Sequence, residues 1–224
     1  TGVEEVLDGE HNMIDALSME PRPEQMIAGL GSRFFVTETA IKTFSVGYPI
    51  QAPLDALLTL RRQHGLTADN VTRIVARLPE DGARIVNDSA MPDVNCQYIL
   101  AVGLIDGALS FADSHSHERM KDPRVLAVKQ RIELVADRAL MDPDAPRSGR
   151  VEVTLRDGRQ LSHFTRFAPG TRENPLDAEG VNAKVRDLMV PVVGVRRADE
   201  IIRSVHAIET FNDMKMFVSL LTPA

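Results

Sequence analysis

Cysteine and aromatic residues are scarce in this sequence of 224 residues. Cys96 is its single cysteine, which excludes an intrachain disulfide framework and a structural zinc site built on cysteines. Tryptophan is missing, and aromatic residues make up 4% of the chain, so no platform for stacking bases is evident. The net charge is −6, with eight acidic and two basic residues among residues 1–40. We therefore expect no nucleic-acid partner, and a reducing cytoplasmic setting is the default.

Long apolar runs and glycine-rich phosphate motifs are missing as well. No stretch approaches the roughly 20 apolar residues that span a bilayer, and the first residues, TGVEEVLDGEH, do not resemble a secretory signal. The sequence contains neither G-x-G-x-x-G nor a Walker-type loop, so we expect no nucleotide cofactor. We expect no membrane association either. Because the chain does not begin with Met, we expect it to be a fragment or a processed half of a longer protein.

Hydrophobic periodicity predicts both helices and strands. Alternating or β-branched runs predict strands at 34–41, 69–79, 132–137, 151–158 and 159–167, the last two joined at Asp157-Gly158. Helical spacing predicts short pieces within 1–30 and helices at 50–64, 93–107, 123–128, 178–189, 195–211 and 213–221. The segment 93–107 is apolar on almost every side, which predicts a buried helix with Asp93 as its N-cap.

These elements predict an α+β fold in three consecutive parts. Residues 34–172 alternate helices and strands and form a small α+β domain. Residues 1–33 and 173–224 are helical, and we expect both to belong to a second, helical body. The chain would thus leave one domain, build another and return to the first.

Lys42 is the first candidate for chemistry. It lies between the expected strand at 34–41 and a helix that begins near Pro49. The first amides of a helix and its dipole favour an anion, and a lysine adds a full positive charge. Gly47 lets the backbone approach a ligand, and Ser45 and Tyr48 add hydroxyl groups. The alternative is a solvated surface lysine, which is the commoner fate of any single lysine.

Tyr98 is the second candidate, because it lies within the expected apolar helix beside Cys96 and Gln97. A buried phenol needs a hydrogen-bond partner, and a backbone carbonyl is the commoner one. The functional alternative is a hydroxyl that faces a polar cleft and binds a carboxylate or moves a proton. Cys96 has no basic neighbour to activate it as a nucleophile.

His115 and His117 form an H-x-H pair, which on a strand can bind a metal ion. Charged residues surround the pair, and no third ligand is suitably spaced. We therefore expect a solvated loop and no metal site.

Several segments together resemble the MmgE/PrpD family. They are KTFSVGYPIQAPLDA (42–56), CQYILAVGLIDG (96–107), His115 with Arg119 and the DPRV run at 122–125, VEVTLRDG (151–158), and GTRENPL (170–176). The resemblance implies a large helical domain, a small α+β domain and an active site in the cleft between them. It further implies that this chain is the C-terminal half, that an N-terminal helical half is missing from it, and that the protein is a homo-oligomer, most simply a homodimer.

The resemblance also implies roles for individual residues. Lys42 falls on the active-site lysine of the family, and Tyr98 on a position where some members place an active-site tyrosine. Gln51 falls where dehydratase-like members carry Gln and other members carry His. With Ser45 and Gly47, we expect Gln51 to bind substrate, whereas Lys42 and Tyr98 are catalytic.

The implied activity is that of a lyase without a cofactor, a dehydratase of the 2-methylcitrate type. Its substrate is a di- or tricarboxylate, which loses a proton next to a carboxylate. The alternatives are a decarboxylase or epimerase of the same family, or a split subunit that acts only by packing against a partner. We expect the general base to lie in the missing half.

Overall fold

The computed structural model describes residues 6–9 and 12–221. The chain divides into two compact units, Thr1–Thr39 and Ala40–Ala224. The described residues form an α+β fold, as the sequence predicts. The expected division of the second unit into an α+β domain and a returning helical segment stays a prediction.

The first unit contains short helical pieces, as expected. They are α1 (Met13–Leu17), α2 (Glu24–Ile27) and a 3-10 turn, η1 (Phe35–Glu38). None of these elements contains a buried residue. The side chain of Asn12 caps α1 by accepting hydrogen bonds from the backbone amides of Ile14 and Asp15.

The strand expected at 34–41 is wrong. The hydroxyl groups of Thr37 and Thr39 donate to the carbonyls of Phe34 and Val36, three residues earlier in each case. Such local bonds favour a turn over a sheet ladder. The apolar side chains that suggested a strand remain exposed, with Val36 at 74%. β-propensity without a partner strand therefore gives no strand here.

The second unit is built around a four-stranded sheet. Its strands are β1 (Val71–Leu78), β2 (Ile132–Ala136), β3 (Gly149–Leu155) and β4 (Gln160–Thr165). Their order is β2-β1-β3-β4, with β1 and β2 parallel and the other pairs antiparallel. The parallel pair needs a crossover, which residues 79–131 supply. The predicted hairpin at Asp157-Gly158 is confirmed, and Gly158 has a φ of 86°.

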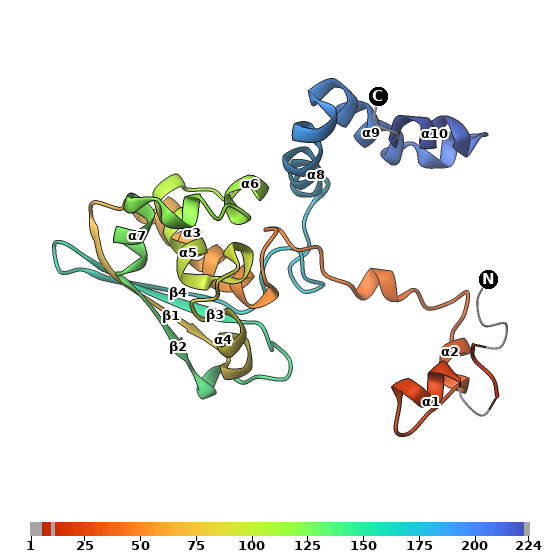
Figure 1. The fold of residues 1–224 in the computed structure, drawn as a ribbon, viewed down its shortest axis with the longest axis horizontal. Coiled ribbons are helices and arrows are strands. Elements are labelled where there is room, and N and C mark those ends of the chain that lie inside the picture. Colours follow the sequence, from red (N-terminus) through yellow and green to blue (C-terminus); the bar gives the residue numbers. More distant parts are fainter. Residues whose placement is uncertain (1–5, 10–11, 222–224) are drawn as a thin grey trace. The chain divides into compact units, whose positions relative to one another are not determined.

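Helices α3 and α5 lie over one face of this sheet (Figure 1). Helix α3 (Gln51–His64) precedes β1. The crossover from β1 to β2 contains α4 (Glu80–Val86), α5 (Cys96–Asp106), α6 (Phe111–Ser114) and α7 (Pro123–Lys129). Short 3-10 turns lie along the same part of the chain: η2 (Tyr48–Ile50), η3 (Pro92–Val94), η4 (Arg119–Lys121) and η5 (Arg138–Leu140). The core joins the inner faces of α3 and α5 to the buried positions of β1 and β3. Burial of these apolar faces provides the main stabilisation of the unit.

Helix α5 is buried over nearly its whole length, as its composition predicts. Its N-cap is Asn95 and not the expected Asp93. The side-chain oxygen of Asn95 accepts a hydrogen bond from the Tyr98 amide at 2.9 Å. Asp93 instead lines a pocket that is described below.

The C-terminal segment is helical, as predicted. It contains α8 (Ala178–Val193), α9 (Val195–His206), η6 (Ile208–Thr210) and α10 (Met214–Leu221). Helix α8 continues through Pro191, beyond its expected end at residue 189. In the part of the chain that the structure describes, no helix is both long and apolar enough to cross a membrane.

Candidate functional site

The backbone around Lys42 is fixed by a turn far along the chain. The amide of Ile41 donates to the carbonyl of Gly170 at 2.8 Å, and the hydroxyl of Thr43 donates to the carbonyl of Pro169 at 2.7 Å. Gly170 has a φ of 94°, and a Cβ atom there would lie 1.9 Å from the carbonyl oxygen of Ile41. Glycine is therefore required at this contact. Lys42 lies between two anchored neighbours, not at the end of a strand.

Gln51, the first residue of α3, fixes the turn that follows Lys42. Its side-chain oxygen accepts from the Phe44 amide at 3.1 Å, and its side-chain nitrogen donates to the Phe44 carbonyl at 2.8 Å. The residue is 1% exposed. Gln51 thus supports the backbone next to Ser45 from the interior, where it pairs with the amide and the carbonyl of a partly buried residue.

Lys42 lines an open pocket of about 490 Å³. The other lining residues come from the turn before α3, from η3, from the loop after α6 and from α8: Ser45, Val46, Gly47, Asp93, Val94, His115 and Lys184. Gly47 gives its amide hydrogen to the Asp93 carbonyl at 2.8 Å. That amide is therefore occupied, and the first turn of α3 does not line the pocket. A second lysine lines the pocket in place of the helix N-terminus that we expected beside Lys42.

Lys184 is this second cation, and its ammonium group lies 3.3 Å from the hydroxyl oxygen of Ser45. Burial lowers the pKa of Lys184; Asp187 opposes that shift, and the positive charge of Lys42 adds to it. The charge of Lys42 thus reaches the region that Lys184 occupies. The sequence carries no local sign of this contact, because Lys184 looks like any lysine of an amphipathic helix.

His115 also lines the pocket. Its Nδ1 lies 3.0 Å from the carbonyl oxygen of Phe111, and its Nε2 lies 4.0 Å from a carboxylate oxygen of Asp93. The tautomer with its hydrogen on Nδ1 satisfies this carbonyl and leaves a lone pair on Nε2, and the hydroxyl oxygen of Ser114 lies 2.9 Å from the same Nδ1. The ring is stacked on Phe111, with centroids 4.1 Å apart. The expected solvated loop thus has an oriented imidazole, and the described residues contain no cluster that could hold a metal ion.

Tyr98 lies behind the pocket, in the core, with 0% exposure. Its hydroxyl donates to the Asp113 carbonyl and lies 3.5 Å from the Ser116 carbonyl, so it contacts backbone on both sides of His115. Burial, with a smaller contribution from Asp113, raises the pKa of Tyr98 to about 12. The commoner of the two expected arrangements, a core tyrosine bonded to a carbonyl, is the one observed. Its contact with substrate stays a prediction.

Cys96 is fully buried in α5. Burial raises the pKa of its thiol to about 12, so the thiolate that a nucleophile requires is disfavoured.

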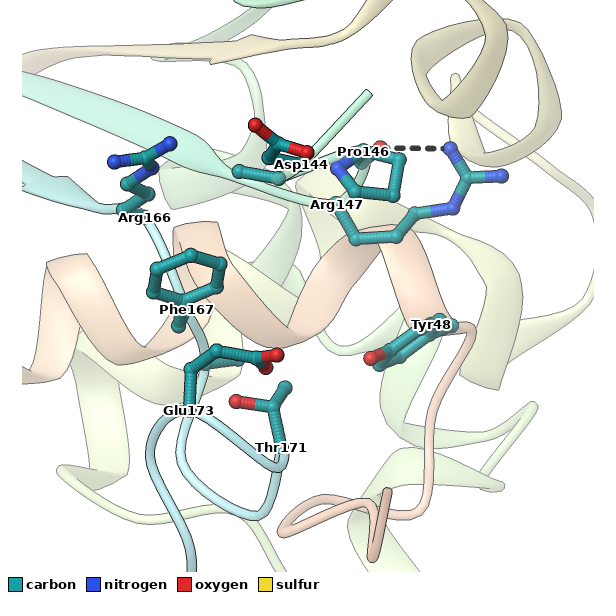
Figure 2. Close-up of a pocket in the computed structure, with 10 residues that line it drawn as sticks. Tyr48, Asp144, Pro146, Arg147, Arg166, Phe167, Thr171 and Glu173 are labelled. Atoms are coloured by element: carbon teal, nitrogen blue, oxygen red, sulfur yellow. Dashed lines mark hydrogen bonds between the residues drawn. The ribbon is translucent and has the colours of Figure 1, made fainter. Parts of the chain in front are cut away.

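A second pocket, of about 180 Å³, suits an anion less well. Figure 2 shows the side chains of Tyr48, Thr171 and Glu173 around it, together with two arginines. Both arginines are already paired: Arg147 with Asp81 at 2.7 Å and Arg166 with Asp142 at 3.1 Å. The site therefore has no uncompensated positive charge. Tyr48, which we expected beside Lys42, lines this pocket instead.

The family of this chain follows from comparison with known proteins. Residues 44–210, more than half of the chain, match the family model described as the MmgE/PrpD C-terminal domain. The chain belongs to the MmgE/PrpD family. Lys42 lies just before the matched range, whereas Ser45, Gly47, His115 and Lys184 lie within it.

Two curated relatives of this MmgE/PrpD chain are lyases by name. The mitochondrial 2-methylcitrate dehydratase of Yarrowia lipolytica is 33% identical over 111 residues, which cover 45% of this chain and 21% of the relative. The cis-aconitate decarboxylase of Aspergillus terreus is 23% identical over 218 residues, which cover 89% of this chain and 44% of the relative. The chain spans less than half the length of either relative.

Proposed function

We propose that this chain supplies part of the active site of a MmgE/PrpD lyase, a dehydratase of the 2-methylcitrate type, acting on a di- or tricarboxylate. The observation that carries the proposal is that Lys42, Ser45 and His115 line one open pocket in a chain of this family. A cation and an oriented imidazole in one pocket are the groups that removal of a proton beside a carboxylate requires.

The reaction begins with loss of the proton on the carbon next to a carboxylate. His115 accepts that proton at Nε2, in the tautomer whose Nδ1 hydrogen meets the Phe111 carbonyl, and it thereby replaces the general base that we expected in the missing half. The electron pair moves toward the carboxylate, where negative charge builds up on oxygen. The ammonium group of Lys42 stabilises that charge. The bond between the neighbouring carbon and its hydroxyl group then breaks as the carbon–carbon double bond forms, and the leaving hydroxide takes the proton from the His115 imidazolium and departs as water. Ser45 contributes a hydroxyl group beside the same oxygen atoms.

Decarboxylation and epimerisation pass through a related carbanion, so the same two residues serve either reaction. The name of the fungal decarboxylase supports the first of these alternatives. A further alternative is a split subunit that acts only by packing against a partner. Assays of the chain alone and together with the N-terminal half of a longer relative separate these cases.

The test of the proposal is Lys42→Met. Lys42 is exposed and contributes nothing to the core, so the variant should fold normally. Loss of one donor to a developing oxyanion typically lowers turnover by a hundredfold to a thousandfold. Turnover is measured on a series of di- and tricarboxylates with the N-terminal half present, and thermal melts check folding. Lys215→Met, at an exposed lysine of α10, is the matched control. Equal turnover by the two variants would overturn the proposal.

A further inference from the structure

The pocket beside Lys42 holds more positive charge than one carboxylate needs. Lys42 and Lys184 both line it, and the single acidic side chain in its lining, Asp93, faces His115 at 4.0 Å. In the described part of the chain, the side-chain hydrogen bond of Lys184 goes to a neutral hydroxyl, and neither lysine forms a salt bridge within 4.0 Å. Two like charges that share a partly buried site raise the energy of the empty protein. An anion with two negative charges removes that cost.

Lys184 is held in place and is not a free surface chain. Its helix, α8, is attached one turn further along, where a carboxylate oxygen of Asp187 accepts a hydrogen bond from the Phe111 amide at 2.9 Å. The Lys184 side chain is half-buried and reaches Ser45 on the turn that follows Lys42. Contacts on both sides of the pocket therefore fix the position of the ammonium group.

The contact with Ser45 also sets the direction of a hydroxyl hydrogen. An ammonium group can only donate, so the Ser45 oxygen accepts from Lys184, and the Ser45 hydrogen is left to donate elsewhere. Lys184 uses one of its three donors in this bond. The pocket thus offers donors from Lys42, Ser45 and Lys184 to one ligand.

We infer that Lys184 binds a second carboxylate of the substrate, so that the pocket selects dianions over monoanions. This inference rests on the proposed function. It adds a residue of α8 that distinguishes ligands by their charge. A pocket of about 490 Å³ has room for a small acid with at least two carboxylates. Lys42 stabilises the carboxylate beside the reacting carbon, and Lys184 anchors the other one.

Calorimetric titration of the full chain with succinate and with butyrate tests the inference. The two acids have four carbons each and differ by one carboxylate. We expect the wild-type chain to bind succinate more tightly. Lys184→Met should weaken succinate binding by about tenfold to a hundredfold, the usual range for a charge-assisted hydrogen bond, and leave butyrate binding unchanged. Lys184→Arg should keep most of the preference, and Lys215→Met should keep all of it.

The variants separate failure of this inference from failure of the proposed function. If Lys42→Met abolishes succinate binding and Lys184→Met does not weaken it, the inference is wrong and the Lys42 site stands. If neither variant weakens succinate binding, or if the wild-type chain binds neither acid, both are wrong. Thermal melts of each variant show that lost binding does not reflect lost folding.

Discussion

At the scale of single residues, the hydroxyl of Tyr98 acts on the pocket through the backbone. It contacts the carbonyls of Asp113 and Ser116, and the segment between them carries His115. A raised pKa keeps the phenol protonated at neutral pH, so it donates a hydrogen bond and does not accept a proton. We therefore expect Tyr98 to position the imidazole of His115.

Tyr98→Phe should loosen the His115 segment without opening the core. We expect stability to fall by about 1 kcal/mol, the usual net value of one hydrogen bond, and turnover to fall less than in Lys42→Met. The specific readout is the His115 imidazole resonance, which should shift or broaden. Tyr48→Phe, in the other pocket, is the matched control and should leave that resonance unchanged. Identical spectra for the two variants would contradict the positioning role.

The lowered pKa of Lys184 predicts two opposite effects of rising pH. Between its lowered folded pKa and its ordinary value, the folded chain binds fewer protons than the unfolded chain. The contribution of this group to the unfolding free energy therefore rises with pH across that window. Dicarboxylate affinity falls across the same window, because the ammonium charge is lost.

Four charged or titratable groups face Lys184 and set the background of this titration: Lys42, Asp93, His115 and Asp187. The difference in pH dependence between the wild-type chain and Lys184→Met isolates the titration of Lys184 from that of these four groups. Succinate titrations and denaturant melts from neutral to alkaline pH measure both effects. The prediction fails if the two proteins show the same pH dependence.

At the scale of elements, the start of α3 supports the turn that precedes this helix. Gln51→Leu keeps a buried side chain but leaves the Phe44 amide and carbonyl without their partner. Each unsatisfied buried polar group costs about 1–3 kcal/mol, so we expect a clear loss of stability. Succinate affinity should also fall, because Ser45 belongs to the same turn.

The matched control for this prediction is Gln63→Leu, at an exposed position near the end of the same helix. Urea melts and succinate titrations compare the two variants. If Gln51→Leu matches Gln63→Leu in stability but binds succinate more weakly, Gln51 does not support the turn and its expected contact with substrate explains its position. If the two variants match in both measurements, both roles are contradicted.

Elements with strong local signals were predictable from the sequence. The apolar α5, closed by Gly107, and the hairpin at Asp157-Gly158 are observed as expected. The strand at 34–41 was wrong because local hydroxyl bonds outweigh β-propensity there, and α4 was missed because Gly82 interrupts a short helical pattern. A sequence pattern ranks local conformations but does not show which segments find a tertiary partner.

Only the part of the candidate site that is contiguous in the sequence was predictable. Lys42, Ser45 and Gly47 stand close together in the sequence, and a local argument groups them. His115 and Lys184 join them only through the packing of distant segments, as the Ser45–Lys184 and Phe111–Asp187 contacts show. No spacing rule connects residues that meet in this way.

At the scale of the whole molecule, apolar side chains remain exposed in both terminal segments. Leu17 and Met19 near the start are 79% and 103% exposed, and Val192 and Met216 near the end are 76% and 66% exposed. Such exposure is typical of surfaces that another chain covers. We therefore expect the chain alone to self-associate, and the N-terminal half of a longer relative to replace that self-association with a defined complex.

Light scattering after size-exclusion chromatography tests this expectation, with and without the N-terminal half. A single monomeric peak over a wide range of concentrations, unchanged by the added half, would contradict it. Replacing Val192 and Met216 with Ser should lower self-association, whereas replacing Val151 of β3, which is buried, should instead lower stability.

The bond from the Ile41 amide to the Gly170 carbonyl has a consequence for how the protein is made. During translation at about 5–20 residues per second, the segment around Lys42 leaves the ribosome on the order of ten seconds before the turn that anchors it. In that interval the lysine has no fixed position. Nascent chains arrested at increasing lengths should therefore bind succinate only after the Pro169–Gly170 turn has emerged, and binding by a chain that ends before this turn would contradict the order.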